Sequence, residues 1–227
     1  MIRSLDAAAA WVDDVGLALL FPKADVVLPS LWEQVAGAAE VEWPSPEMDF
    51  LWPAKDELPA RGLVCVGKHL ARVVSCVAPR LLPALVAANG DDADPGPVAE
   101  AVRALGPLTA PQLREETGLP KKEVDRALVS LHHRLVLTTS HLVEQDAGWG
   151  ALAHDLLARK WRLPPRLPAR DEARRELATL VLDAARELTA ADLAGVFGWR
   201  RKEAAEILDQ VADGRDDEAG FRIWTRR

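Results

Sequence analysis

Residues 97–161 and 169–227 repeat the same order of predicted elements, and this repeat narrows the choice of fold more than any other pattern in the chain. In residues 97–161, apolar spacing and breakers predict helices at 97–105, 110–117 and 121–134. Thr109 is a suitable N-cap for the middle helix. A strand is expected at 135–139, with residues 141–144 as its partner in a hairpin.

Residues 169–227 give helices at 172–186, 190–197 and 200–212, and a final strand at 221–224. Thr189 caps the middle helix and Gly198 ends it. Helix, helix, turn, helix and β-hairpin is the order of a winged helix. We therefore predict two winged helices in tandem.

Two stretches divide the chain into units. Residues 89–97 are rich in Gly, Pro and Asp, and residues 162–168 contain three prolines. The predicted units are 1–90, 97–161 and 169–227. Within the first, we expect a helix at 5–15, strands at 26–28 and 63–66, a helix at 70–88, and Trp-packed loops around 43–46 and 52–53. The predicted fold class is α+β and predominantly helical, with tandem winged helices preceded by a small mixed α/β unit.

The charge distribution excludes a chain that binds nucleic acid through its overall charge. The net charge is −7, and residues 1–96 hold all of the excess, with 7 Lys and Arg against 14 Asp and Glu. Residues 97–160 hold 8 against 8, and residues 161–227 hold 13 against 13. Contact with DNA would require a local basic patch in the balanced part.

Membrane, metal and cofactor signals are absent from the sequence. The apolar runs at 7–12 and 15–21 fall short of the roughly 18 residues of a membrane span, so we expect a cytoplasmic protein without membrane contact. Cys65 and Cys76 are spaced neither as a zinc ribbon nor as a redox pair, and we expect buried free thiols. No histidine spacing predicts a metal site, and no glycine pattern predicts a phosphate loop, so neither a metal nor a cofactor is expected.

No motif identifies a catalytic group. Ser30 lacks the flanking glycines of a nucleophile elbow and instead predicts a capping box with Glu33. Lys55-Asp56 and Lys68-His69 are candidates for lining a cleft, without a spacing that would make them catalytic.

The helix at 121–134 is the best candidate for reading DNA. Val124, Leu128, Leu131 and Leu135 form its buried stripe. The opposite side and the N-terminal end present cations suited to phosphates and guanine edges. The predicted DNA contacts are Lys121, Lys122, Arg126 and His133, assisted by wing residues near His141.

The corresponding helix at 200–212 differs in charge. Its outward positions are Lys202, Glu206, Asp209 and Asp213, and three acids there would repel phosphate. Arg200, Arg201 and Lys202, at its start, could still contact a DNA backbone. We expect this second winged helix to be structural or to bind protein.

Several segments resemble the AlkZ/YcaQ family of DNA glycosylases, which act on bulky alkylated purines and interstrand crosslinks. They are residues 106–109, 123–128, 131–134, 161–164 and 172–174. Residues 15–21 and 28–32, with Lys55 and Gly67-Lys68, resemble a shorter AlkZ-related group. The resemblance implies a winged-helix protein of DNA repair.

The glycosylases of that family carry a Gln-x-Gln or Gln-x-Asp pair, which positions water and steadies the positive sugar. Residues two positions after the four glutamines here are Ala36, Arg114, Ala147 and Ala212, so no pair is present. We therefore expect a non-catalytic protein that binds double-stranded DNA. One alternative is a protein-interaction module that pairs with itself or another protein through the second winged helix. The other is a divergent glycosylase that uses Glu33 or Asp56.

Overall fold

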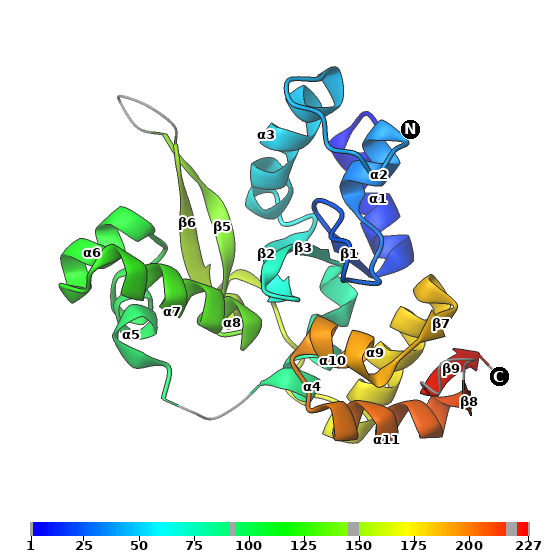
Figure 1. Ribbon diagram of the computed structural model, residues 1–227. Coiled ribbons are helices and arrows are strands. Elements are labelled where there is room, and N and C mark those ends of the chain that lie inside the picture. Colours follow the sequence, from blue (N-terminus) through cyan, green and yellow to red (C-terminus); the bar gives the residue numbers. More distant parts are fainter. Residues whose placement is uncertain (1, 91–93, 145–149, 217–221, 227) are drawn as a thin grey trace.

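The computed structural model describes residues 2–90, 94–144, 150–216 and 222–226. About 53% of the chain is helical, and the described strands form three small sheets (Figure 1). This confirms the part of the predicted fold class that is predominantly helical α+β. None of the described helices is long and apolar enough to cross a membrane.

The first unit runs from α1 to α4. Its elements are α1 (Leu5–Val15), β1 (Leu17–Leu19), α2 (Leu31–Ala36), α3 (Pro46–Ala60), β2 (Cys65–Leu70), β3 (Val73–Val77), the 3-10 turn η1 (Pro79–Leu81) and α4 (Leu82–Asn89). Ser30 and Glu33 form the predicted capping box at the start of α2. This box satisfies two backbone N–H groups that a helix start leaves without partners.

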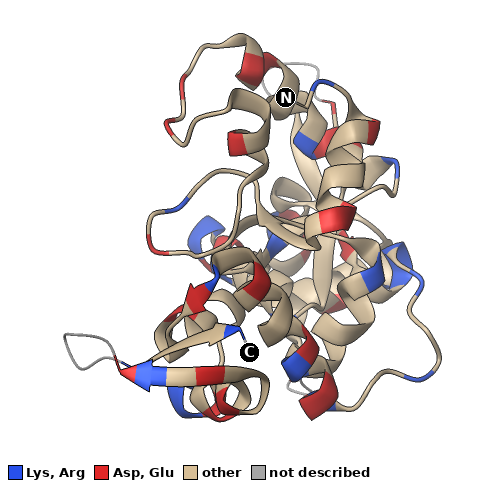
Figure 2. Cartoon of the chain, turned by 90° about the vertical axis from the view of Figure 1, so that its right-hand side faces the viewer, with Lys and Arg blue, Asp and Glu red and all other residues tan. Residues whose placement is uncertain are grey.

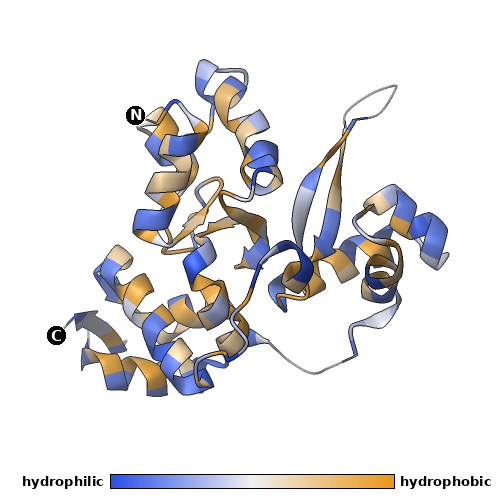
Figure 3. Cartoon of the chain, turned by 180° about the vertical axis from the view of Figure 1, so that it is seen from behind, coloured by the Kyte–Doolittle hydropathy of each residue, from blue (hydrophilic) through white to orange (hydrophobic). Residues whose placement is uncertain are grey.

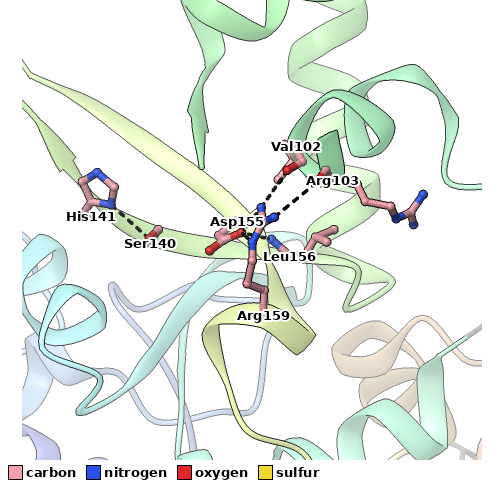
Figure 4. Close-up of polar contacts among 7 residues, drawn as sticks. All are labelled: Val102, Arg103, Ser140, His141, Asp155, Leu156 and Arg159. Atoms are coloured by element: carbon pink, nitrogen blue, oxygen red, sulfur yellow. Dashed lines mark hydrogen bonds and ion pairs between the residues drawn. The ribbon is translucent and has the colours of Figure 1, made fainter. Parts of the chain in front are cut away.

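The second unit follows with α5 (Gly96–Leu105), β4 (Leu108–Thr109), α6 (Ala110–Thr117), α7 (Lys121–His133), β5 (Leu137–Val143), β6 (Ala151–Leu156) and α8 (Leu157–Lys160). Thr109 caps α6 as predicted. Arg159 ties α8 to the end of α5, because its guanidinium donates to the carbonyls of Val102 and Arg103 and to the carboxylate of Asp155 (Figure 4). The Val102 carbonyl, which also accepts from the N–H of Gly106, thereby gains a second donor, and the Arg103 carbonyl gains one.

The third unit consists of α9 (Arg170–Ala185), β7 (Glu187–Leu188), α10 (Ala190–Phe197), α11 (Arg201–Val211), β8 (Ala212–Asp216) and β9 (Arg222–Arg226). Thr189 caps α10 and Gly198 ends it in the left-handed conformation, both as predicted. Of the predicted final strand, Phe221 lies outside the described residues.

All three units share one topology. Each has a helix, a short strand, two helices and a hairpin, and the last strand of each is central in its sheet. The strand orders are β1-β3-β2, β4-β6-β5 and β7-β9-β8, with every pair antiparallel. The first unit therefore has the same element order as the two units that the sequence identified as a repeat.

The apolar core is divided unequally among the units. Buried residues of the first and third units form one continuous cluster, which Leu135, Leu157 and Trp161 of the second unit join. The strands of the first sheet are mostly apolar and lie near the centre of the molecule (Figure 3). The rest of the second unit has a separate cluster around Val98, Leu113 and Leu128. The second unit is thus packed largely on itself.

Four local predictions were wrong. Residues 26–28 form no strand, and residues 73–77 form β3 rather than part of a helix. Residues 46–60 form α3, although irregular loops were expected near Trp52 and Pro53. Residues 141–143 continue β5, whose hairpin partner is β6.

Candidate functional site

A cleft of about 1100 Å³ separates the first unit from the second. Helix α3 and the β2–β3 hairpin form one wall, and α7 with the β5–β6 hairpin forms the other (Figure 1). Much of the lining is apolar and includes Leu20, Phe21, Val66, Leu128 and Leu152. Its volume lies just above the roughly 300–1,000 Å³ that ligand sites usually occupy.

A nearly buried ion pair lies in the α3 wall. Lys55 Nζ is 2.6 Å from Asp56 Oδ1, and the two side chains are only 13% and 10% exposed. The same ammonium lies 4.3 Å from the centre of the Trp52 ring. Trp43 meets Trp52 edge to face, with ring centres 5.3 Å apart. Because Lys55 neutralises Asp56, this pair adds polarity to the cleft but little net charge.

Three histidines connect the two walls. The backbone N–H of Lys68 on β2 donates to His132 Nδ1 on α7, at 3.2 Å. His132 Nε2 lies 3.0 Å from His154 Nδ1 on β6. His69 Nδ1 lies 2.8 Å from the carbonyl oxygen of His132, to which it donates. Burial is the main cause that lowers the pKa of each ring, to about 4 for His69 and His154 and well below the usual value for His132.

Gly67 makes room for these rings. A Cβ at this position would lie 2.4 Å from His132 Nδ1 and 2.5 Å from His69 Nε2. Behind the rings, Cys65 Sγ lies 3.3 Å from Thr138 Oγ1. Cys65 and Cys76 are buried free thiols, as expected, and burial raises the pKa of each to about 12.

A basic groove of about 640 Å³ lies beside the cleft, with which it shares Asp125 and Val129. Its other lining residues are all cations, namely Arg72, Lys121, Lys122 and Arg126. Arg72 belongs to the tight turn between β2 and β3, where Ala71 and Arg72 have φ of 49° and 57°. Such left-handed conformations are strained for residues with a side chain. The N–H of Ala71 donates to the carbonyl of Val196, which anchors this turn to α10.

The predicted contact residues of α7 and the wing occupy different settings. Lys121, Lys122 and Arg126 are exposed and lie together in the basic groove. His133 is half-buried and its Nδ1–H donates to the carbonyl of His69, so this ring joins α7 to β2. His141 lines the cleft, with Nδ1 3.1 Å from the hydroxyl of Ser140 (Figure 4).

The predicted cations of α11 lie outside both hollows. Arg200, Arg201 and Lys202 are exposed at the start of this helix. Lys202 lies 3.9 Å from Glu206, and Asp209 accepts a hydrogen bond from Trp224 Nε1. On the face of the molecule shown in Figure 2, basic and acidic segments are interleaved.

Sequence reasoning identified part of the cleft and missed the rest. Lys55, Asp56 and Lys68 line it as expected. His69 is buried and does not line it, and Glu33 is held in the capping box of α2. Arg72 of the basic groove and His132 and His154 of the cleft were missed. Arg72 follows no recognisable turn signal. The role of the two histidines depends on contacts between elements far apart in the chain, which the sequence does not show.

The topology and the two hollows define a helical protein with three small antiparallel sheets and a cleft bordered by cations. The model of the AlkZ-related family matches residues 2–198, and the chain belongs to this family. Membership relates the chain to DNA repair. Comparison with curated proteins and with solved structures gives no match.

Proposed function

We propose that the chain is a non-catalytic protein that binds double-stranded DNA through the basic groove, and that its three units are winged helices. The observation that carries this proposal is the gathering of Arg72, Lys121, Lys122 and Arg126 in one hollow at the start of α7. In a winged helix, the third helix is the one that enters the major groove. In the second unit, this helix is α7.

The charge of the groove favours phosphate as its ligand. Four cations face one carboxylate, Asp125, and that carboxylate forms an ion pair with Lys121. Arg72 extends the cationic surface from α7 to a second element, which suits a backbone that passes across both. α11 lacks this arrangement, because acids follow its basic start.

Salt-dependent binding of a labelled duplex, followed by fluorescence anisotropy, tests the proposal. We expect micromolar or tighter binding at low salt. The log–log slope should lie between about −2 and −4, since each phosphate contact contributes about −0.9. No binding even at low salt would refute the proposal.

A matched pair of variants tests which helix makes the contact. Lys122 and Lys202 are both exposed in the first turn of the third helix of their unit. Lys122→Glu should weaken binding at least tenfold and make the slope shallower by about 1. Lys202→Glu should leave the affinity within twofold of wild type. Equal effects of the two changes would contradict the choice of α7.

A divergent glycosylase is a second candidate, favoured by the place of Asp56. Of the two carboxylates considered from the sequence, Asp56 lines the cleft and Glu33 does not. Release of a free base from alkylated DNA, lost in Asp56→Asn, would support this activity. Absence of release with enzyme in excess would exclude it.

The protein-interaction alternative makes a different prediction. A stable dimer in light scattering, combined with no affinity for DNA at low salt, would favour a protein-interaction module over the non-catalytic DNA-binding protein and the glycosylase.

A further inference from the structure

The histidines between the two walls form a chain of hydrogen bonds with one direction. The N–H of Lys68 donates to His132 Nδ1, so this nitrogen must offer a lone pair and cannot carry a proton. The single proton of the His132 ring is therefore on Nε2. That N–H faces His154 Nδ1 at 3.0 Å, which must accept it. The proton of His154 is left on Nε2.

His154 Nε2 has no hydrogen-bond partner among the described residues. Among the described residues, only Trp161 Nε1 is a fully buried side-chain nitrogen or oxygen without a partner, so His154 Nε2 is not fully buried. Because His154 lines the cleft, we take the cleft as the side to which this N–H is accessible. The backbone N–H of Lys68 can only donate. Through the His132 and His154 rings, it therefore determines that His154 offers a hydrogen-bond donor to the cleft. Burial lowers the pKa of both rings, which keeps this arrangement uncharged at neutral pH.

We propose that His154 is a ligand-contacting hydrogen-bond donor of the cleft. His132 is the positioning residue that holds the proton of His154 on Nε2. The ligand is an uncharged heteroaromatic ring with an acceptor atom. Much of the lining of the cleft is apolar, which suits a ring. The ammonium of Lys68 also lines the cleft and disfavours a cationic ligand. Each of the carboxylates that line the cleft is already paired with a cation: Asp56 with Lys55, Glu57 with Arg61, and Asp125 with Lys121.

An unpaired base of bound DNA is the source of such a ring that the neighbouring groove favours. The groove and the cleft share Asp125 and Val129, so DNA on α7 would run past the mouth of the cleft. This part of the inference rests on the proposed DNA binding. A free heterocyclic compound has the same ring chemistry, and the experiment separates the two sources.

The tautomer is tested first, without any ligand. Nitrogen-15 NMR of the histidine rings at pH 7 should show His154 protonated on Nε2. In His132→Leu this preference should weaken towards a mixture, and His132→Gln, whose amide can donate to the same atom, should restore it. A wild-type His154 protonated on Nδ1 would overturn the proposal.

Binding is then measured with three probes. They are a duplex with one unpaired 2-aminopurine opposite an abasic site, the same duplex fully paired, and the free 2-aminopurine nucleoside. Wild type should bind the unpaired duplex tighter than the paired one. His154→Phe should weaken binding of the unpaired duplex about three- to tenfold, the equivalent of one neutral hydrogen bond, without changing the paired duplex. His154→Gln, which keeps a donor, should recover part of the loss.

The outcomes distinguish the two proposals. If both duplexes bind equally and the nucleoside does not bind, the cleft proposal is overturned while the DNA-binding proposal stands. If neither duplex binds but the nucleoside shifts the His154 ring signals, the cleft takes a free compound and the DNA-binding proposal fails. An unpaired-duplex preference that survives in His154→Phe overturns the role of His154.

Discussion

Replacing Gly67 with alanine should test the packing on which the histidine chain depends. The added Cβ would lie 2.4 Å from His132 Nδ1 and 2.5 Å from His69 Nε2, closer than real Cβ contacts. Neither ring is free to move, because His69 is bonded to the His132 carbonyl and His132 is bonded on both nitrogens. Overpacking of this kind costs about 1–3 kcal/mol. Displacing a buried ring from a hydrogen bond adds about 1–3 kcal/mol.

The expected loss in the free energy of unfolding for Gly67→Ala is therefore about 2–6 kcal/mol. Urea denaturation measures it as a lower midpoint with an unchanged slope. Gly195→Ala is the matched control, since Gly195 lies inside α10 and a Cβ there meets nothing within 4 Å. That change should stabilise the protein by about 0.5–1 kcal/mol through helix propensity. A Gly67→Ala variant within 0.5 kcal/mol of wild type would refute the reasoning.

Two further predictions concern buried titratable groups. The pKa of His69 and His154 is about 4 in the folded protein, against about 6.5 in an unfolded chain. Below pH 6.5 only the unfolded chain gains these protons, so the free energy of unfolding should fall by roughly 1.4 kcal/mol per pH unit for each ring, down to about pH 4. A urea midpoint that is the same at pH 7 and pH 5 would contradict this. Cys65 and Cys76, with pKa raised to about 12, should not react with a thiol reagent in the native state, and both should react in denaturant. Rapid labelling of the native protein would show that either thiol is accessible.

Local signals explain why the second and third units were largely predictable. The caps at Thr109 and Thr189 depend on residues three positions away, and the buried stripe of Val124, Leu128 and Leu131 lies on one helix. Leu135, which was predicted to continue this stripe, lies beyond the end of α7. The basic face of α7 follows from the same periodicity. Lys121, Lys122 and Arg126 were therefore expected side by side before any tertiary contact was known.

In the first unit, predictions from local sequence signals failed at α3 and β3, among other places. Pro53 was interpreted as a sign of a loop, yet it lies inside α3 on an exposed position, where water can satisfy the carbonyl left without a partner. Leu51, Ala54 and Leu58 nevertheless have helical spacing and are all buried. In residues 70–88, the β-branched Val73, Val74 and Val77 indicated a strand that the long apolar run concealed.

The histidine chain could not be predicted, because it joins elements on either side of the boundary between the two apolar clusters. Lys68 and His69 on β2 bond with His132 and His133 on α7, more than 60 positions away. The Thr138 hydroxyl donates to the carbonyl of Val66 across the same boundary. These polar contacts supplement the few apolar residues that the second unit contributes to the main cluster.

Protonation of His132 Nδ1 would replace an acceptor with a donor facing the N–H of Lys68. The neutral state of His132 that keeps the proton of His154 on Nε2 therefore also holds the two walls of the cleft together. The neutral state of these rings therefore links the hydrogen-bond donor in the cleft to the acid sensitivity of the fold.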